Sequence, residues 1–528
     1  MDSPVTMTLP AEESRAESKP IGQTRMASES FHRFIIGDRP NRRRLIIALA
    51  GTLLQFIVFK ILYPFPDFFS DSYSYIYAAY AHLDVSIWPI GYSKFLASFH
   101  SLTHSDTALV GFQYFFLEAA AAYFYFSLLY FYRPGRATRV ILFLFLFFNP
   151  LFLYLTNYVN SDPLFAALSL WWFTELIWIV NRPRLYQVVM QGVLLFLAFT
   201  VRNNAYIYPF IAVAAFLLSQ QRTWVKAIGC LLGPMLILPF VWHTRSAAKE
   251  MTGTAQFSLF TGWQLANNAL YMYGHIRVDS SAFATKESRE VNDISKAFFK
   301  TVPVTFDDFL FDYQANYFIQ YQGAPLKMYL DKHYHPASEN DRVANWGDAS
   351  VHFGEFGSTL IKAHPIQYAR YFVLLNTRKY LFPSLEKLEI YNTGSHDVES
   401  IAQYWFDYKI TDVAVISGTI QGKVLFLYPY FFMFLNVCMV GMLTRFFIGR
   451  GFRQAGQANL RSMLVFISFL ALNFLFCIST TIIVLRYQFF PMIACLSGLL
   501  LLFEWSGKTA VSARERQRRS YKLAGTLG

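Results

Sequence analysis

The sequence predicts an all-α membrane protein with about ten transmembrane helices and a large, mostly helical extracytoplasmic loop domain. The first reason is composition, because 54% of the 528 residues are hydrophobic and 55 of them are Phe. A soluble domain cannot bury that much apolar surface. The second reason is that Lys and Arg gather in short clusters between apolar runs, which is typical of orientation signals. These clusters account for the net charge of +12 without a nucleic-acid partner.

The N-terminal part begins with a polar segment, 1–32, which we expect to be a disordered cytoplasmic tail. An arginine cluster precedes the first apolar run at about 45–63 and places the N-terminus in the cytoplasm. The cluster consists of Arg33, Arg39, Arg42, Arg43 and Arg44. An N-terminal transmembrane module then covers 33–243 and includes a first outer loop at 64–106. Within this loop, the segment 88–99 is amphipathic and short, which favours a position along the membrane surface.

Three further spans are predicted at about 107–131, 140–156 and 163–180. The next apolar stretch, 186–219, is long enough for one tilted span or two short ones, and the polar sequence V-R-N-N at 201–204 interrupts it. A single span would place the later basic clusters outside, so the positive-inside rule favours two.

The second half of the chain contains one large region between apolar runs. After a span at about 226–243, the region 244–424 is rich in Trp, Tyr, Phe and Asp, with helical periodicity at 357–382. We expect it to be an ordered extracytoplasmic domain. C-terminal transmembrane helices follow over 425–505, and a basic cytoplasmic tail covers 506–528. The expected spans in this part are about 425–444, 462–484 and 488–504.

The first outer loop opens with an acidic, aromatic stretch at 65–80, F-P-D-F-F-S-D-S-Y-S-Y-I-Y-A-A-Y. Carboxylates at the mouth of a membrane helix are costly to place, so Asp67 and Asp71 are candidates for function. One of them could act as the general base that deprotonates an acceptor hydroxyl. The alternative for Asp71 is that it caps the helix that follows.

Positive charges are rare in the predicted outer loops. Arg202 and Arg486 stand at the outer ends of spans, and Lys94 lies in the surface segment. A bound anionic group would offset their cost, and the planar fork of Arg suits phosphate. Alternatively, each Arg extends to the interface or pairs with a neighbouring Asp. Asp162 also falls at the outer face, although its position before Pro163 is typical of a helix start.

Several chemical motifs are absent from the sequence. It contains no P-loop, no dinucleotide glycine fingerprint, no HExxH and no nucleophile elbow, and its four Cys show no metal spacing. We therefore expect no cofactor and no metal site. An enzyme that works outside the cytoplasm without nucleotide sites needs a donor already activated in the membrane, and a polyprenyl-phosphate sugar meets that requirement.

Six stretches together resemble the GT-C superfamily of integral-membrane glycosyltransferases, which includes protein O-mannosyltransferases and the aminoarabinose transferases of lipid A. They are S-D-S-Y-S-Y-I around Asp71, P-I-G-Y-S-K-F-L at 89–96, N-S-D-P-L-F at 160–165, V-R-N-N-A-Y-I-Y-P at 201–209, A-H-P-I-Q-Y at 363–368 and L-R-Y-Q-F-F-P at 485–491. The resemblance extends over most of the chain from about 45 to 505.

The resemblance implies a role for several of these residues. The loop aspartate that acts as base in the family falls on Asp71, with Asp67 as the competing choice. The arginine near the donor phosphate falls on Arg202 or Arg486, and the acidic residue at the outer end of a later helix falls on Asp162. The rest of the predicted substrate-binding set consists of Tyr75, Tyr487, Lys94 and Asn203. Because Ser72 follows Asp71, the sequence lacks the Asp-Glu pair of some members.

The expected protein is a multi-pass glycosyltransferase of the plasma membrane with both termini in the cytoplasm. It would move a sugar from a polyprenyl-phosphate donor to an extracytoplasmic glycan, lipid or protein. One alternative is a glycan polymerase or ligase with a lipid-diphosphate donor, which would not require Asp71. Another is a membrane transporter or flippase, which needs charges buried at mid-membrane or broken helices.

Overall fold

The computed structural model describes residues 29–301, 316–449, 451 and 456–524, with side chains through Ser506. These residues are 78% helical and form no strand, which confirms the all-α prediction for the described part of the chain. Most of the predicted N-terminal tail, residues 1–28, lies outside the described residues. The chain divides into two units, 1–50 and 51–528.

The first unit contains a π-helix, η1 (Arg33–Gly37), and the start of α2 (Arg39–Leu62). The predicted arginine cluster therefore lies in helical backbone immediately before the first apolar run. Helix α2 continues into the second unit, which holds all the remaining elements.

Eight helices of the described chain are long and apolar enough to cross a membrane. They are α2, α5 (Asp106–Tyr132), α6 with α7 (Arg136–Phe147 and Pro150–Thr156), α8 (Ser161–Asn181), α11 (Thr223–Thr252), α21 with α22 (Ile420–Leu425 and Tyr428–Ile448), α24 (Gln457–Thr480) and η8 with the first part of α25 (Leu485–Gln488 and Phe489–Ala524). The chain is therefore a helical protein of multi-pass character.

The apolar stretch 186–219 forms two shorter apolar helical segments. Helix α9 (Leu185–Val201) ends at Arg202, whose backbone is extended, and a 3-10 turn, η2 (Asn203–Ile207), leads into α10 (Tyr208–Leu218). The interruption predicted at V-R-N-N is thus a real break between helices.

The apolar run predicted as one span at about 140–156 is also broken into two helices, and no such break was predicted. Asn149 lies between α6 and α7, and its side chain accepts a hydrogen bond from Leu151 N at 3.0 Å. Pro150 occupies the first position of α7, where its missing N–H costs nothing. An Asn cap followed by proline therefore restarts the helix.

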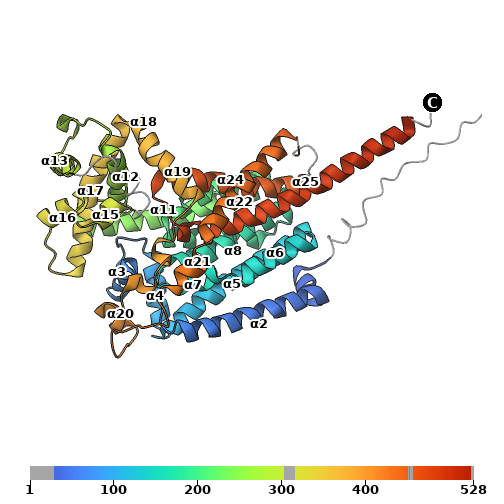
Figure 1. Cartoon of the computed structure of the whole chain (residues 1–528), viewed down its shortest axis with the longest axis horizontal. Coiled ribbons are helices and arrows are strands. Elements are labelled where there is room, and N and C mark those ends of the chain that lie inside the picture. The colour runs from blue at the N-terminus through green and yellow to red at the C-terminus, as the bar shows by residue number, and fades with distance from the viewer. Residues whose placement is uncertain (1–28, 302–315, 450, 452–455, 525–528) are drawn as a thin grey trace, which may run out of the picture. The chain divides into compact units, whose positions relative to one another are not determined.

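The long helices pack as a bundle in which α5 contacts α8, α8 contacts α9 and α9 contacts α11 (Figure 1). Helix α22 packs on α25 in the same way. At one end of the bundle the Asn181 amide donates to Tyr132 Oη at 3.1 Å and to Ser462 Oγ at 2.9 Å. The C-terminal ends of α5 and α8 and the N-terminal end of α24 therefore meet there.

The described residues of 244–424 form a helical assembly around an apolar core to which Ile482 and Val484 also contribute. Helix α11 continues to Thr252, so this assembly begins later in the chain than the predicted span end at about 243. Its main helices gather beyond one end of the bundle in Figure 1. They are α12 (Thr261–Tyr273), α13 (Lys286–Thr301), α16 (Pro325–His333) and α17 (Glu339–Ala363). The core includes the buried side chains of Trp263, Phe353, Phe356 and Phe372.

Shorter elements complete the fold. They are α3 (Ser70–Tyr80), α4 (Gly91–His100), η3 (Ser280–Ala282), α15 (Tyr317–Gln320), α18 (Pro365–Tyr368), η5 (Ala369–Val373), α19 (Leu374–Leu381), η6 (Glu386–Leu388), η7 (Tyr391–Gly394) and α20 (Ser400–Trp405). Helix α25 continues to Ala524, so much of the predicted basic tail is a continuation of that helix.

Helices α12 and α17 approach closely through glycines. A Cβ atom at Gly357 would lie 2.4 Å from Leu265 C and 2.5 Å from Ala266 N, which are backbone atoms of α12. Backbone cannot move aside as a flexible side chain can, so this crossing requires glycine.

We expect Gly357→Ala to lower the stability of the protein by about 1–3 kcal/mol or more, because the added methyl group forces the two helices apart. The measurement is thermal unfolding of the purified protein in detergent. Gly441→Ala is the matched control, since Gly441 also lies inside a helix and nothing lies within 4 Å of its Cβ position. Equal unfolding temperatures for the two variants would contradict the close crossing.

Candidate functional site

Four helix ends bring together charged residues that are far apart in the sequence. Asp71 lies in the first turn of α3 and Asp162 in the first turn of α8. Arg202 follows the last residue of α9, and Arg486 lies in η8 directly before α25. Negative charge is favourable at a helix N-terminus and positive charge at a C-terminus, so three of these positions suit their helix dipoles.

Asp162 is the centre of the cluster. Its Oδ1 pairs with Arg202 Nη1, and its Oδ2 lies 3.2 Å from Arg486 Nη1. The N-cap of α8 is Asn160, so the capping interpretation of Asp162 is wrong. Asp162 instead lies inside the first turn, where its buried carboxylate bridges two guanidinium groups.

Arg486 meets two further carboxylates. Its Nη1 lies 3.8 Å from Asp71 Oδ2, and its Nε lies 3.4 Å from Glu386 Oε2. The residue is only 9% exposed and stands at a helix N-terminus, where the dipole disfavours a cation. The three surrounding carboxylates offset both costs.

The connection that carries Arg486 is held by the helical assembly. Asn376 on α19 donates from Nδ2 to Thr481 O at 2.7 Å and accepts from Ile483 N at 3.2 Å. Leu485 N donates to Ser384 O at 2.9 Å. This last contact brings the segment of Glu386 beside Arg486.

Aromatic rings surround the two arginines. The guanidinium carbons of Arg202 and Arg486 each lie 4.8 Å from the ring centroid of Tyr487. The same carbon of Arg486 lies 5.0 Å from the Phe69 centroid. The Phe69 contact orients the guanidinium group of Arg486 without using a hydrogen-bond donor, whereas Arg486 Nη2 also donates to Tyr487 Oη at 3.2 Å.

Tyr75 joins the cluster through a serine. Its hydroxyl lies 2.9 Å from Ser161 Oγ, and Arg202 Nη1 lies 3.5 Å from the same oxygen. The predicted substrate-binding residues Arg202, Arg486, Asp162, Tyr75 and Tyr487 therefore lie together.

Beside a small hollow of about 20 Å³ between Asp162, Arg202 and Arg486, two larger cavities adjoin this cluster. The first, which we call the Arg202 cavity, has a volume of about 380 Å³, and its lining includes Tyr75, Arg202 and Asn203. The second, the Asp71 cavity, has a volume of about 330 Å³, and its lining includes Asp71 and Arg486. Their shared wall includes Trp88, Phe260 and Tyr487.

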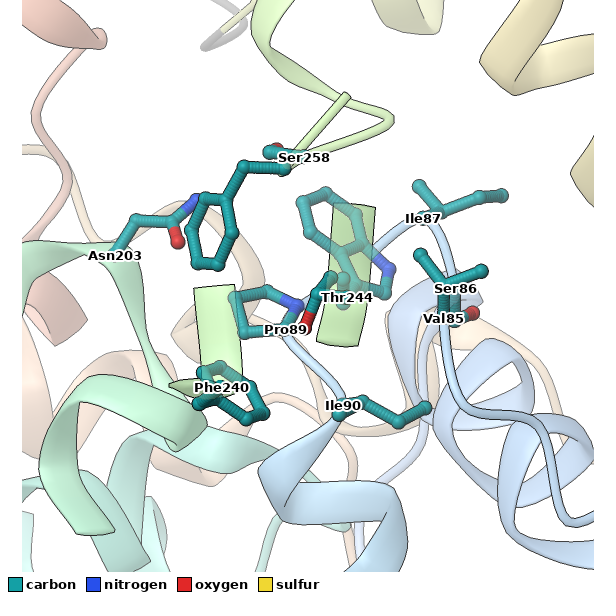
Figure 2. A pocket seen from close by; sticks show the side chains of 11 residues that line it. Val85, Ser86, Ile87, Pro89, Ile90, Asn203, Phe240, Thr244 and Ser258 are labelled. Atoms are coloured by element: carbon teal, nitrogen blue, oxygen red, sulfur yellow. The ribbon is translucent and has the colours of Figure 1, made fainter. Parts of the chain in front are cut away.

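The segment that carries Trp88 also packs against α11 and the connections that follow α9 and α11. Figure 2 shows residues 85–90 against Asn203, Phe240, Thr244 and Ser258, around a small hollow of about 20 Å³. A hollow of that size holds no more than a water molecule. This contact therefore supports the wall of the larger cavities. The predicted surface segment 88–99 forms helix only from Gly91, and α4 packs on α3 and α9.

Asp71 does not cap its helix, because the N-cap of α3 is Phe69. Burial raises the pKa of Asp71 to about 6, and the field of Arg486 opposes that rise. At pH 7 the carboxylate is therefore mostly ionised, with a pKa close to that of an effective general base.

Asp67 and Lys94 lie outside the cluster. Asp67 is buried, and its carboxylate accepts from Asn392 N at 2.7 Å and from Gln421 Nε2 at 3.4 Å. Lys94 pairs with Asp84 at 2.7 Å, and both side chains are about half exposed. Neither residue lines the Arg202 cavity or the Asp71 cavity.

Sequence reasoning missed Glu386, Ser161, the cavity wall at Trp88, and Lys387, which also lines the Asp71 cavity. Glu386 has a left-handed backbone with φ of 52°, which is uncommon for a residue other than glycine. Strained backbone is concentrated at functional sites, yet the sequence L-E-K-L gives no sign of it. Ser161 lay inside the N-S-D-P motif and could have been found there.

Within the described part of the chain, no group of three or more His, Cys, Asp or Glu side chains is arranged to hold a metal ion. The predicted absence of a metal site and of a cofactor stays a prediction.

Comparisons with protein-family models, curated proteins and solved structures found no match to this chain. The membership of the GT-C superfamily that the motifs suggested therefore stays a prediction.

We expect the stability of the protein to fall as the pH rises toward about 7, because burial raises the pKa of Asp67 from 3.8 to about 7. Below about pH 4 the side chain is protonated in both the folded and the unfolded state. Between the two pKa values the unfolded chain releases the proton and the folded chain keeps it. The free energy of unfolding therefore falls by at most about 4 kcal/mol by the time the pH exceeds about 7.

Asp67→Asn removes this part of the pH dependence. The measurement is the unfolding temperature of both proteins between about pH 5 and about pH 8. Asp341→Asn, which changes an exposed carboxylate on α17, is the control and keeps the wild-type profile. Parallel curves for wild type and Asp67→Asn would show that Asp67 is not held in its protonated form.

Proposed function

We propose that the protein is a membrane glycosyltransferase that moves a sugar from a polyprenyl-phosphate donor to an extracytoplasmic acceptor. The observation that carries this proposal is the juxtaposition of Asp71 with Arg486, and through Asp162 with Arg202, beside two cavities. A general base next to paired guanidinium groups is what transfer from a lipid phosphate requires.

The donor phosphate would bind between the arginines at the edge of the Arg202 cavity. Among the described residues, Arg202 makes side-chain hydrogen bonds only through Nη1. Its Nε and Nη2 therefore remain for a phosphate oxygen. Apolar and aromatic side chains such as Leu265 and Phe476 line part of this cavity, beside polar ones such as Asn268, and the apolar part suits the first isoprene units of the lipid.

The acceptor would enter the Asp71 cavity. Its hydroxyl oxygen attacks the anomeric carbon of the donor sugar, and Asp71 takes the hydroxyl proton. The bond between the anomeric carbon and the phosphate oxygen breaks, and both of its electrons leave with the polyprenyl phosphate. Arg202 and Arg486 stabilise the negative charge that develops on this leaving group. Because the acceptor displaces the phosphate directly in one step, the transfer inverts the anomeric configuration.

The proposed topology places the cluster on the extracytoplasmic side. Helix α8 begins beside Asp162 and ends near Arg182, and α9 begins near Arg184 and ends at Arg202. The ends of α8 and α9 near Arg182 and Arg184 therefore lie opposite the cluster. Under the positive-inside rule these basic ends mark the cytoplasmic side. With α9 and α10 as two short spans, the proposed count is ten, with 244–424 outside and both termini in the cytoplasm.

The positions of the six family-like stretches also support the proposal. Four of them supply the cluster, namely those around Asp71, Asp162, Arg202 and Arg486. A fifth stretch contributes Pro89 to the wall of the Arg202 cavity. Convergence of short, separate motifs in space favours a common function over chance similarity.

One observation keeps a transporter as the second candidate function. Glu118 on α5 and Glu175 on α8 are buried in helices of membrane-spanning character. Tyr123 Oη donates to Glu175 Oε1 at 3.1 Å. Carboxylates at such positions are typical of ion and proton pathways.

Asp71→Asn tests the proposed function. We expect loss of transfer by a factor of about 10²–10⁴, because the base is gone, while the lipid phosphate still binds. Cells that lack the protein should accumulate a polyprenyl-phosphate sugar, detected by mass spectrometry of lipid extracts, and the Asp71→Asn variant should fail to clear it. Binding of undecaprenyl phosphate to the purified variant in nanodiscs should match wild type.

Asp84→Asn is the control, because Asp84 lies in the same loop but pairs with Lys94 at the surface. It should clear the lipid intermediate as wild type does. Full clearance by Asp71→Asn would remove Asp71 from the mechanism and favour a lipid-diphosphate enzyme. Clearance that depends on Glu175 and not on Asp71 would favour transport.

A further inference from the structure

The Asp71 cavity is also lined by aromatic and basic side chains that do not belong to the charged cluster. Trp88, Phe260 and Trp346 line it, together with Lys327 on α16 and Arg342 on α17. These residues come from the first loop and from the helical assembly, so only the folded chain brings them together.

The aromatic side chains form a connected surface. The ring centroids of Trp88 and Phe260 lie 4.7 Å apart, and the rings of Phe260 and Trp346 are nearly parallel with centroids 6.5 Å apart. Trp346 in turn stacks on the buried Trp263 at 3.9 Å, which fixes its orientation. A surface of this kind suits the apolar C–H faces of sugar rings.

Lys327 lies above this surface. Its Nζ is 4.9 Å from the Trp346 ring centroid and 5.8 Å from the Trp263 centroid. It makes no ion pair with any carboxylate of the described residues. Burial lowers the pKa of Lys327, and a bound anion would reverse that effect.

The charge of the cavity favours an anionic ligand. Four basic side chains line it, namely Lys327, Arg342, Lys387 and Arg486, against two acidic ones, Asp71 and Glu386. Arg486 is already engaged by three carboxylates, whereas the ion pair of Arg342 with Glu339 at 2.6 Å is about half exposed and therefore weak. Lys327 and Arg342 therefore form a second basic wall, separate from the one proposed for the donor phosphate.

We propose that the Asp71 cavity binds an anionic saccharide as the acceptor, with sugar rings against Trp88, Phe260 and Trp346 and the negative group held by Lys327 and Arg342. This inference rests on the proposed transfer function, since it names the acceptor class of that same site. The negative group is a carboxylate or a phosphate, because both suit an ammonium and a guanidinium group.

Binding to the full-length protein in nanodiscs tests the inference by calorimetry. The probes are a tetrasaccharide that contains uronic acid, the same tetrasaccharide with the carboxylates reduced to alcohols, and its phosphorylated form. We expect at least one anionic form to bind about tenfold more tightly than the neutral one, which corresponds to one charge-assisted hydrogen bond. This preference should decline with added salt.

Lys327→Gln should remove most of the preference for the anionic form and leave the weak binding of the neutral form unchanged. Lys332→Gln is the matched control, because Lys332 lies on the same helix, pairs with Glu290 and does not line the cavity. It should behave as wild type. Unfolding temperatures of the variants identify any loss that comes from misfolding.

Two outcomes overturn the inference: equal binding of neutral and anionic forms, including no binding of either, or an unchanged preference in the correctly folded Lys327→Gln variant. The Asp71→Asn variant separates this inference from the proposed function. If it clears the lipid intermediate but keeps the anionic preference, the transfer role of Asp71 fails and the anion site stands. If it is inactive and the wild type shows no preference, the transfer role stands and the anion site fails.

Discussion

The carboxylate of Asp162 contacts two guanidinium groups, and the rest of the site depends on that contact. Two like charges about 4 Å apart repel by about 4 kcal/mol at an effective dielectric constant of about 20, so a shared anion lowers the cost of burying neighbouring arginines. Asp162 supplies it through both oxygens, one to Arg202 and one to Arg486. Asp71 and Glu386 then balance Arg486 from the other side.

The helical assembly at 244–424 has a structural role in this arrangement. Through Asn376 and Ser384 it holds the connection between α24 and α25, and that connection carries Arg486. Ile482 and Val484 of the same connection belong to the core of the assembly. The region therefore does more than cover the bundle, because it sets one of the two guanidinium positions and also supplies the wall with Lys327.

The sequence predicted the fold better than the site. Apolar runs and basic clusters located the long helices, and V-R-N-N marked the true break before α10, because these signals are local. Asp71 could be singled out because a carboxylate at the mouth of a membrane helix is costly, and Arg486 because positive charges are rare in the predicted outer loops. Glu386 and Trp88 could not, because their places depend on tertiary contacts and on a left-handed backbone. Asp67 and Lys94 look equally suitable as site residues in the sequence. The structure separates them from the cluster, because Asp67 is buried against Asn392 and Lys94 pairs with Asp84 at the surface.

The most direct measurement is an electron cryo-microscopy structure of the protein in nanodiscs with undecaprenyl phosphate. We expect the phosphate to lie between Arg202 and Arg486, within about 3 Å of a nitrogen of each, with Asp162 still in contact with both arginines. A phosphate bound elsewhere, with the two guanidinium groups engaged only by protein carboxylates, would rule out the proposed donor site.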